Sequence, residues 1–255
     1  MGHVILKKNS LIQVVCMLRF PSLLEIEQNL PVNFQKPLRD LFPKSAQTQE
    51  PDDTVNINLP LANRMPGAFI LQQRKNYQFT SSDTLSSVGL TKDYVAVMTS
   101  AYSGWDNFKE NICVVLHSLH DAYDIQLFSH IELRYVNLIT KQQYNLPQDM
   151  PWSELISPQL VGLLDTSGAG GTIYSSETSL YISYPDSQEQ IFSHFGTAFN
   201  PQKEPAFVID CNAFLPISVN SGQVLNVLDS LHEKSHSFLN YSLTEKMYKL
   251  MEPES

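Results

Sequence analysis

The sequence lacks the features by which several classes of protein are identified. It has no apolar run of the roughly 18 residues that a transmembrane helix needs, and its opening, MGHVILKKNS, contains no signal-peptide core. It has no run of lysine or arginine, and its 26 acidic and 17 basic residues give a net charge of −9. Such a surface repels the phosphates of nucleic acids. We therefore expect a cytoplasmic protein that binds neither a membrane nor a nucleic acid.

Cysteine is scarce as well. The three cysteines, Cys16, Cys113 and Cys211, lie far apart in the chain, and each stands in an apolar stretch. This pattern is typical of reduced, buried thiols. It argues against a disulfide framework and against a zinc site built from cysteines.

The motifs of common enzyme classes are also missing. The glycine-rich SGAGGT (167–172) follows a predicted helix and precedes a predicted strand, which is the reverse of the order in a phosphate-binding loop. No serine nucleophile elbow occurs, and no cysteine stands in an activating context. We accordingly predict no catalytic residue and no cofactor, and the sequence favours a protein that is not an enzyme.

The hydrophobic pattern, in contrast, predicts many regular elements. Strands are expected at 11–20, 68–82, 84–90, 93–102, 130–140, 175–185, 190–199 and 206–214. Helices are expected at 31–42, 105–123, 152–164 and 221–243, and the polar, Pro- and Asp-bearing stretch at 45–56 is expected to be an exposed loop.

The order of these elements suggests an internal duplication. Strand, helix, three strands and helix occur twice, and consecutive strands with short links are most simply antiparallel. The predicted fold class is therefore α+β, with two similar halves of strand–helix–three antiparallel strands–helix and a mostly antiparallel sheet. We place the first half at 1–129 and the second at 130–255, and we expect them to form one integrated unit.

Several segments carry a family resemblance. The strand LRYVN (133–137) and the helix entry formed by Tyr102, Trp105 and Phe108 are its most specific parts. These two segments resemble a sporadically distributed family of uncharacterised prokaryotic proteins of about this length. The resemblance extends to residues 15–26, 79–112, 207–214 and 228–244. The resemblance covers essentially the whole chain and implies one cooperating unit. It supplies no reaction, and the family's distribution suggests a role in a defence or mobile-element operon.

The sequence HEKSH (232–236) matches the H-E-x-x-H pattern of zinc metalloproteases. His232 and His236 are spaced one helical turn apart, and Glu233 would stand beside the metal-bound water. A third ligand is missing, since Glu245 is expected to continue the same helix. In the family that the chain resembles, the triplet Leu231-His232-Glu233 is usual, but a histidine at the position of His236 is not. A helix flank with solvated or hydrogen-bonded histidines is therefore the favoured interpretation.

Polar residues in predicted strands form the last candidate cluster. Alternation places Tyr135 and Asn137 on one face of their strand and Arg134 on the other. Arg134 and Asp210 both stand among apolar neighbours, and a buried charge needs a partner. We predict that Arg134 pairs with a carboxylate, either Asp210 or Asp83. The role of this pair is structural or, as the alternative, it helps to line a ligand pocket.

Three functions follow from these features. The leading hypothesis is a non-enzymatic accessory protein that binds another protein or a second copy of itself through an open sheet face or edge. The alternative is a small-ligand or nucleotide-binding domain with a pocket near Arg134, Tyr135 and Asn137. The third is a zinc-dependent hydrolase at His232 and its neighbours in HEKSH.

Overall fold

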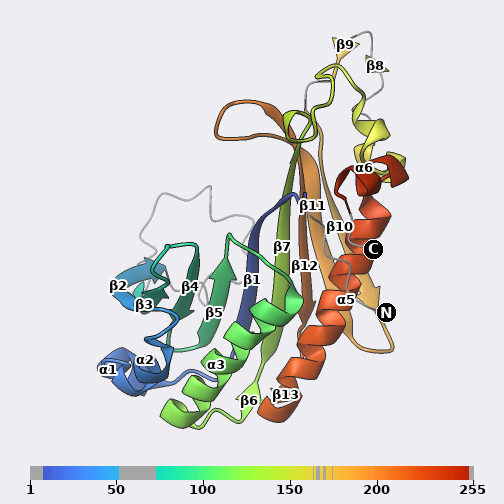
Figure 1. Cartoon of the computed structure of the whole chain (residues 1–255). Helices are drawn as coiled ribbons and strands as arrows, with labels where there is room; N and C mark the ends of the chain where they lie inside the picture. Colours follow the sequence, from blue (N-terminus) through green and yellow to red (C-terminus); the bar gives the residue numbers. More distant parts are fainter. Residues whose placement is uncertain are drawn as a thin grey trace, which may run out of the picture.

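The fold is built on one large antiparallel sheet. The computed structural model describes residues 8–51, 73–162, 164, 167–168, 171–173 and 175–252 (Figure 1). Among these, nine strands form a sheet in the order β10-β11-β12-β7-β1-β5-β4-β3-β2. The strands are β1 (Leu11–Arg19), β2 (Lys44–Pro51), β3 (Gln73–Thr80), β4 (Ser86–Leu90), β5 (Tyr94–Thr99), β7 (His130–Thr140), β10 (Glu177–Tyr184), β11 (Glu189–Phe199) and β12 (Pro205–Leu215). Short pairs join β6 (Leu127–Phe128) to β13 (Val219–Asn220) and β8 (Ser167–Gly168) to β9 (Gly171–Thr172).

Two long helices lie side by side on one face of this sheet (Figure 1). The helices are α1 (Leu24–Gln28), α2 (Val32–Leu38), α3 (Trp105–Tyr123), α4 (Pro158–Val161), α5 (Val224–Ser242) and α6 (Glu245–Leu250). The long pair is α3 and α5, and α2 packs against α3, where the rings of Phe34 and Tyr123 lie 6.4 Å apart. The protein is thus a mixed helix and strand fold with a large antiparallel sheet. None of the described helices is both long and apolar enough to cross a membrane.

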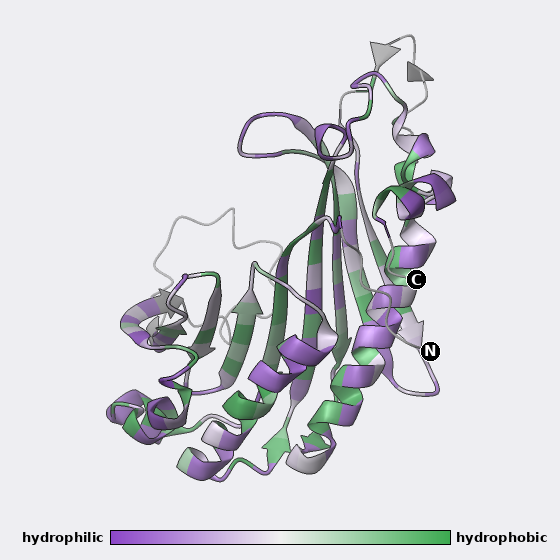
Figure 2. Ribbon diagram, viewed as in Figure 1, coloured by the Kyte–Doolittle hydropathy of each residue, from purple (hydrophilic) through white to green (hydrophobic). Residues whose placement is uncertain are grey.

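The two faces of the sheet differ because side chains alternate along each strand. In β1, Val14, Cys16 and Leu18 are buried beneath the helices, while the residues between them are partly open to solvent. Figure 2 shows hydrophobic and hydrophilic residues alternating along the central strands. We call the face under α3 and α5 the helix face, and the opposite face, which includes Arg134, the open face. The core of the protein lies between the sheet and these helices.

The centre of the sheet joins segments far apart in the sequence. Strand β1 pairs antiparallel with β5 on one side and with β7 on the other. Across β1 and β7, Val14 stands opposite Tyr135, and Val15 stands opposite Arg134. Hydrogen bonding therefore runs without interruption from the strands of 1–129 into those of 130–255.

Three local expectations are wrong. Residues 45–51, expected to be part of a loop, belong to the edge strand β2, because their backbone pairs with β3 while the side chains of residues 44–49 face solvent. The helix expected at 152–164 is replaced by a 3-10 turn at Trp152–Glu154 and the short α4, which ends at Gly162 with a φ of 62°. Residues 52–72, together with 163, 165–166, 169–170 and 174, lie outside the described part of the chain.

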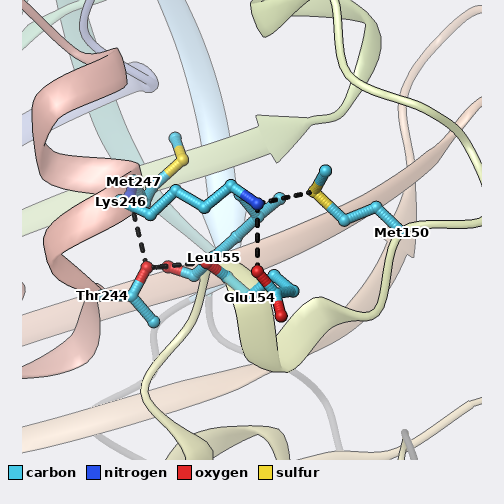
Figure 3. Close-up of polar contacts among 6 residues, drawn as sticks. All are labelled: Met150, Glu154, Leu155, Thr244, Lys246 and Met247. Atoms are coloured by element: carbon cyan, nitrogen blue, oxygen red, sulfur yellow. Dashed lines mark hydrogen bonds and ion pairs between the residues drawn. The ribbon is translucent and has the colours of Figure 1, made fainter.

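The third wrong expectation concerns the end of α5. The chain leaves α5 after Ser242, and Glu245 begins a new helix, α6, rather than continuing the old one. The Thr244 hydroxyl caps α6 by accepting a hydrogen bond from the Met247 N–H, and it donates to the Glu154 carbonyl at 2.8 Å. Lys246 reaches the Glu154 carboxylate at 3.0 Å (Figure 3). These contacts fix α6 against the segment that follows β7.

Candidate ligand pocket between α3 and α5

A pocket opens on the helix face, where the start of α3 approaches the middle of α5. Its cavity volume is about 140 Å³. The residues that line it are Asn9, Leu11, Tyr102, Ser103, Gly104, Trp105, Tyr135, Asn137, Ile209, Cys211, His232, Ser235, His236, Phe238 and Leu239. This lining is mostly apolar and contains no aspartate, glutamate, lysine or arginine. Ser103 at the rim is exposed, so the pocket communicates with solvent.

The entry into α3 supplies two aromatic walls of the pocket. Gly104 has a φ of 126°, a conformation that favours glycine, and it turns the chain so that Trp105 begins the helix. The ring of Phe108 lies behind both walls, with its centroid 6.1 Å from that of Tyr102 and 6.4 Å from that of Trp105. All three aromatic residues of the predicted signature therefore pack together, and two of them face the pocket.

Trp105 connects α3 to α5. Its indole stacks on the imidazole of His232, with centroids 4.6 Å apart and an interplanar angle of 10°. The indole N–H donates to Asp229 Oδ1 at 2.8 Å, and Lys109 Nζ lies 2.6 Å from Asp229 Oδ2. The carboxylate thus holds the indole and a lysine of α3 at once, which fixes the orientation of the ring beside the pocket.

The floor of the pocket is the helix face of β7. The Tyr135 hydroxyl lies 2.7 Å from His232 Nδ1, and the ring of Tyr102 meets that of Tyr135 edge to face at 5.9 Å. Burial raises the pKa of Tyr135 well above its usual value, and burial is also the main cause that raises the pKa of Tyr102 to about 12. Both phenols therefore stay protonated near neutral pH. Further along the strand, the buried Asn137 accepts a hydrogen bond from the Ser10 hydroxyl at 2.9 Å.

Arg134 lies on the open face, away from this pocket. As predicted, it pairs with Asp210, and its Nε donates to Asp210 Oδ1 at 2.7 Å. Asp83 is part of a turn instead, where its carboxylate accepts from the Ser81 hydroxyl and the Leu85 N–H. The pair is not buried as expected, because the Arg134 side chain is 44% exposed on a face that α3 and α5 do not cover. Of the three residues around which a pocket was expected, Tyr135 and Asn137 line the pocket on the helix face, and Arg134 does not.

The five residues of HEKSH have separate environments. His232 is buried in the pocket, Glu233 is exposed, and His236 stands at the pocket rim within 3.3 Å of Asn240. Lys234 pairs with the buried Glu189 at the start of β11, and the Ser235 hydroxyl donates to the Leu231 carbonyl. In the part of the chain that the structure describes, no group of three or more histidine, cysteine, aspartate or glutamate side chains is arranged to hold a metal.

Four of the pocket's residues stand out in the sequence, but for separate reasons. Tyr102 and Trp105 belong to one helix entry, Tyr135 to a strand and His232 to a metal motif, and the structure brings the four together. Asp229 has no local signal in the sequence, because its contact with Trp105 spans 124 positions in the chain. No family model matches the chain, and a search of curated proteins finds no match, so the family resemblance stays a prediction.

Proposed function

We propose that the protein binds a small organic molecule in the pocket between α3 and α5. The observation that carries this proposal is the convergence of Tyr102, Trp105, Tyr135 and His232 on one mostly apolar cavity. Ligand sites are typically concave and apolar, with a few polar groups that orient the ligand. The hydrogen bonds of Trp105 and Tyr135 hold the rings in place before a ligand arrives, which lowers the entropy lost on binding.

The size of the cavity supports a ligand role over plain packing. Protein interiors are close-packed, and empty space next to large side chains is costly. The pocket opens to solvent, so a ligand can enter its volume of about 140 Å³ and cover apolar walls that would otherwise face water.

A thermal-shift screen with neutral and charged metabolites tests the proposal. A molecule that binds only the folded state raises the melting temperature in a concentration-dependent way. Leu239→Trp should fill the pocket and abolish that shift, because Leu239 lines the cavity. Leu225→Trp is the matched control, since Leu225 is a partly buried leucine of the same helix that does not line the pocket. A broad screen without a hit would refute the proposal.

A second function is supported by a different feature, an aromatic cluster on the open face. Tyr181 is 58% exposed, Phe192 is 44% exposed, and the rings of Phe214 and His130 stack nearby at 5.4 Å. Beside them, the charges of Arg134 and Asp210 are neutralised by each other. We propose that this aromatic surface binds the same surface of a second copy, because like faces meet in a two-fold symmetric dimer.

Light scattering on the purified chain tests this second proposal. We expect a dimer that becomes a monomer when Tyr181 and Phe192 are both replaced by serine. Replacing the exposed Leu24 and Leu30 by serine is the control, because these residues lie in and after α1, remote from the aromatic cluster. A strict monomer at high concentration would rule out the dimer, and capture of an unrelated protein by this surface would assign it to another partner.

We also infer that the two halves of the chain are structurally equivalent. The sheet order β1-β5-β4-β3 in the first half has its counterpart in β7-β12-β11-β10, and α3 and α5 follow the last strand of each set. This correspondence supports an internal duplication with a junction near residue 129. The pocket then lies where the two halves meet, which is a common place for ligand sites.

A further inference from the structure

We infer that the ligand of this pocket is an uncharged aromatic molecule of one ring or two fused rings. The inference rests on the proposed ligand-binding function and specifies the chemistry of the molecule. Three properties of the described residues carry it: the size of the cavity, the absence of acidic residues, lysine and arginine from its lining, and the aromatic character of its walls.

The size of the cavity limits the ligand. An engineered apolar cavity of roughly 150 Å³ accommodates benzene, and the volume here is about 140 Å³. The exposed Ser103 and the half-buried His236 stand at the rim, so a second fused ring can extend toward solvent. A nucleotide with its sugar and phosphates is too large for this space.

The lack of lysine and arginine in the lining disfavours an anionic ligand. The nearest cation on α3 is Lys109, and Asp229 already neutralises it at 2.6 Å. Arg134, the cation of the adjacent strand, points to the open face and pairs with Asp210. A carboxylate or phosphate would therefore leave water for a mostly apolar site that has no lysine or arginine to compensate its charge and only His232 and His236 as basic side chains, which is unfavourable.

The walls of the cavity favour a flat ring with one polar group. Aromatic side chains attract other rings by stacking or edge-to-face contact, beyond the effect of buried area. Because the Ser235 hydroxyl donates to the Leu231 carbonyl at 2.9 Å, its oxygen can accept a hydrogen bond in the pocket. An aromatic N–H or O–H, as in indole or phenol, is the complement of that acceptor.

Titration calorimetry with four probes tests the inference. Indole and phenol are the neutral aromatic probes, benzoate is an anionic ring of similar size, and cyclohexanol is the non-aromatic match for phenol. We expect indole and phenol to bind at least tenfold more tightly than benzoate and cyclohexanol. Leu239→Trp should weaken indole binding tenfold or more, while Leu225→Trp should leave it unchanged.

The outcomes separate this inference from the function on which it rests. Tighter binding of benzoate or cyclohexanol, lost in Leu239→Trp, would overturn the inferred ligand class and leave the pocket as a binding site. Indole binding that survives Leu239→Trp would place the aromatic site elsewhere and overturn the inference. Failure of all four probes, together with a metabolite screen without a hit, would overturn both.

Discussion

The indole of Trp105 and the imidazole of His232 are stacked with their centroids 4.6 Å apart, and they join α3 to α5 at the candidate pocket. Trp105 is held by Asp229, and His232 is held by Tyr135, so each ring has one hydrogen-bonded anchor. Two helices and the central strand β7 are thereby connected through one stack. This arrangement makes the stack a determinant of stability as well as a wall of the pocket.

Replacement of His232 should show how much the stack and its hydrogen bond contribute. His232→Phe keeps a flat ring beside Trp105 but leaves the buried Tyr135 hydroxyl without this partner, which should cost about 1–3 kcal/mol of unfolding free energy. His232→Ala also leaves a cavity, so we expect a larger loss, roughly 3–5 kcal/mol. Urea denaturation measures both. Equal losses for the two variants would contradict the stacking contribution.

The pair of Glu189 with Lys234 offers a test of buried charge. Glu189 is 4% exposed, accepts from the Ser230 hydroxyl at 3.1 Å, and pairs with Lys234, whose Nζ lies 5.0 Å from the centroid of the Tyr184 ring. Lys234→Met removes the cation and should cost about 3–5 kcal/mol, because a buried carboxylate loses its partner.

The double variant supplies the control for this prediction. Adding Glu189→Gln to Lys234→Met removes the uncompensated charge and should recover most of the lost stability. If chemical denaturation shows the double variant to be less stable than Lys234→Met alone, the charge interaction is not what stabilises this site.

The pair of Arg134 with Asp210 should contribute much less. Its guanidinium is 44% exposed, so water and salt screen the interaction. We expect Arg134→Met and Asp210→Asn each to change the unfolding free energy by about 0.5–1 kcal/mol, with a coupling of similar size in a double-mutant cycle. The coupling should shrink at high salt. If either single variant lost several kcal/mol of unfolding free energy, the pair would have to be shielded from solvent, which would contradict its exposure in this structure.

Alkaline pH should destabilise the protein through its buried tyrosines. The pKa of Tyr102 is raised to about 12 and that of Tyr135 is raised well above its usual value, both mainly by burial. Between pH 10 and 12 the unfolded state therefore loses phenolic protons that the folded state keeps. Stability is fully present below pH 10 and falls as the pH rises, by at most about 1.4 kcal/mol per pH unit for each tyrosine.

Urea denaturation between pH 9 and 12 tests whether the unfolding free energy falls as the pH rises. Tyr135→Phe and Tyr102→Phe should each make the decrease less steep, because each removes one shifted group. A slope that is identical in wild type and both variants would mean that other groups control the alkaline transition.

The parts of the fold that follow from local pattern were predictable. The apolar spacing of 105–123 and the alternation of 130–140 match α3 and β7 within a residue, because these elements bury a continuous stripe or one face. The same alternation correctly separated Arg134 from Tyr135. Strand β2 has no apolar alternation, and the side chains of residues 44–49 are exposed, so only its backbone pairing with β3 reveals it.

The pocket depends on long-range placement that no local pattern encodes. The helical pattern put His232 on the flank of α5, but its burial depends on where α3 lies, and that is set by the packing of both helices on the sheet. The pairing of Arg134 with a carboxylate was predictable because a charge in an apolar strand needs a partner. The exposure of the Arg134 side chain was not predictable, because the sequence does not show which face of the sheet the helices cover.

The central position of β1 also constrains how the chain is made. During synthesis β1 emerges first among the strands of the sheet, yet its neighbours β5 and β7 follow only after long intervening stretches. Its apolar residues, among them Val14 and Leu18, must therefore wait unpaired on the nascent chain. Because closing such long loops is slow, folding is expected to lag behind translation until β7 has left the ribosome.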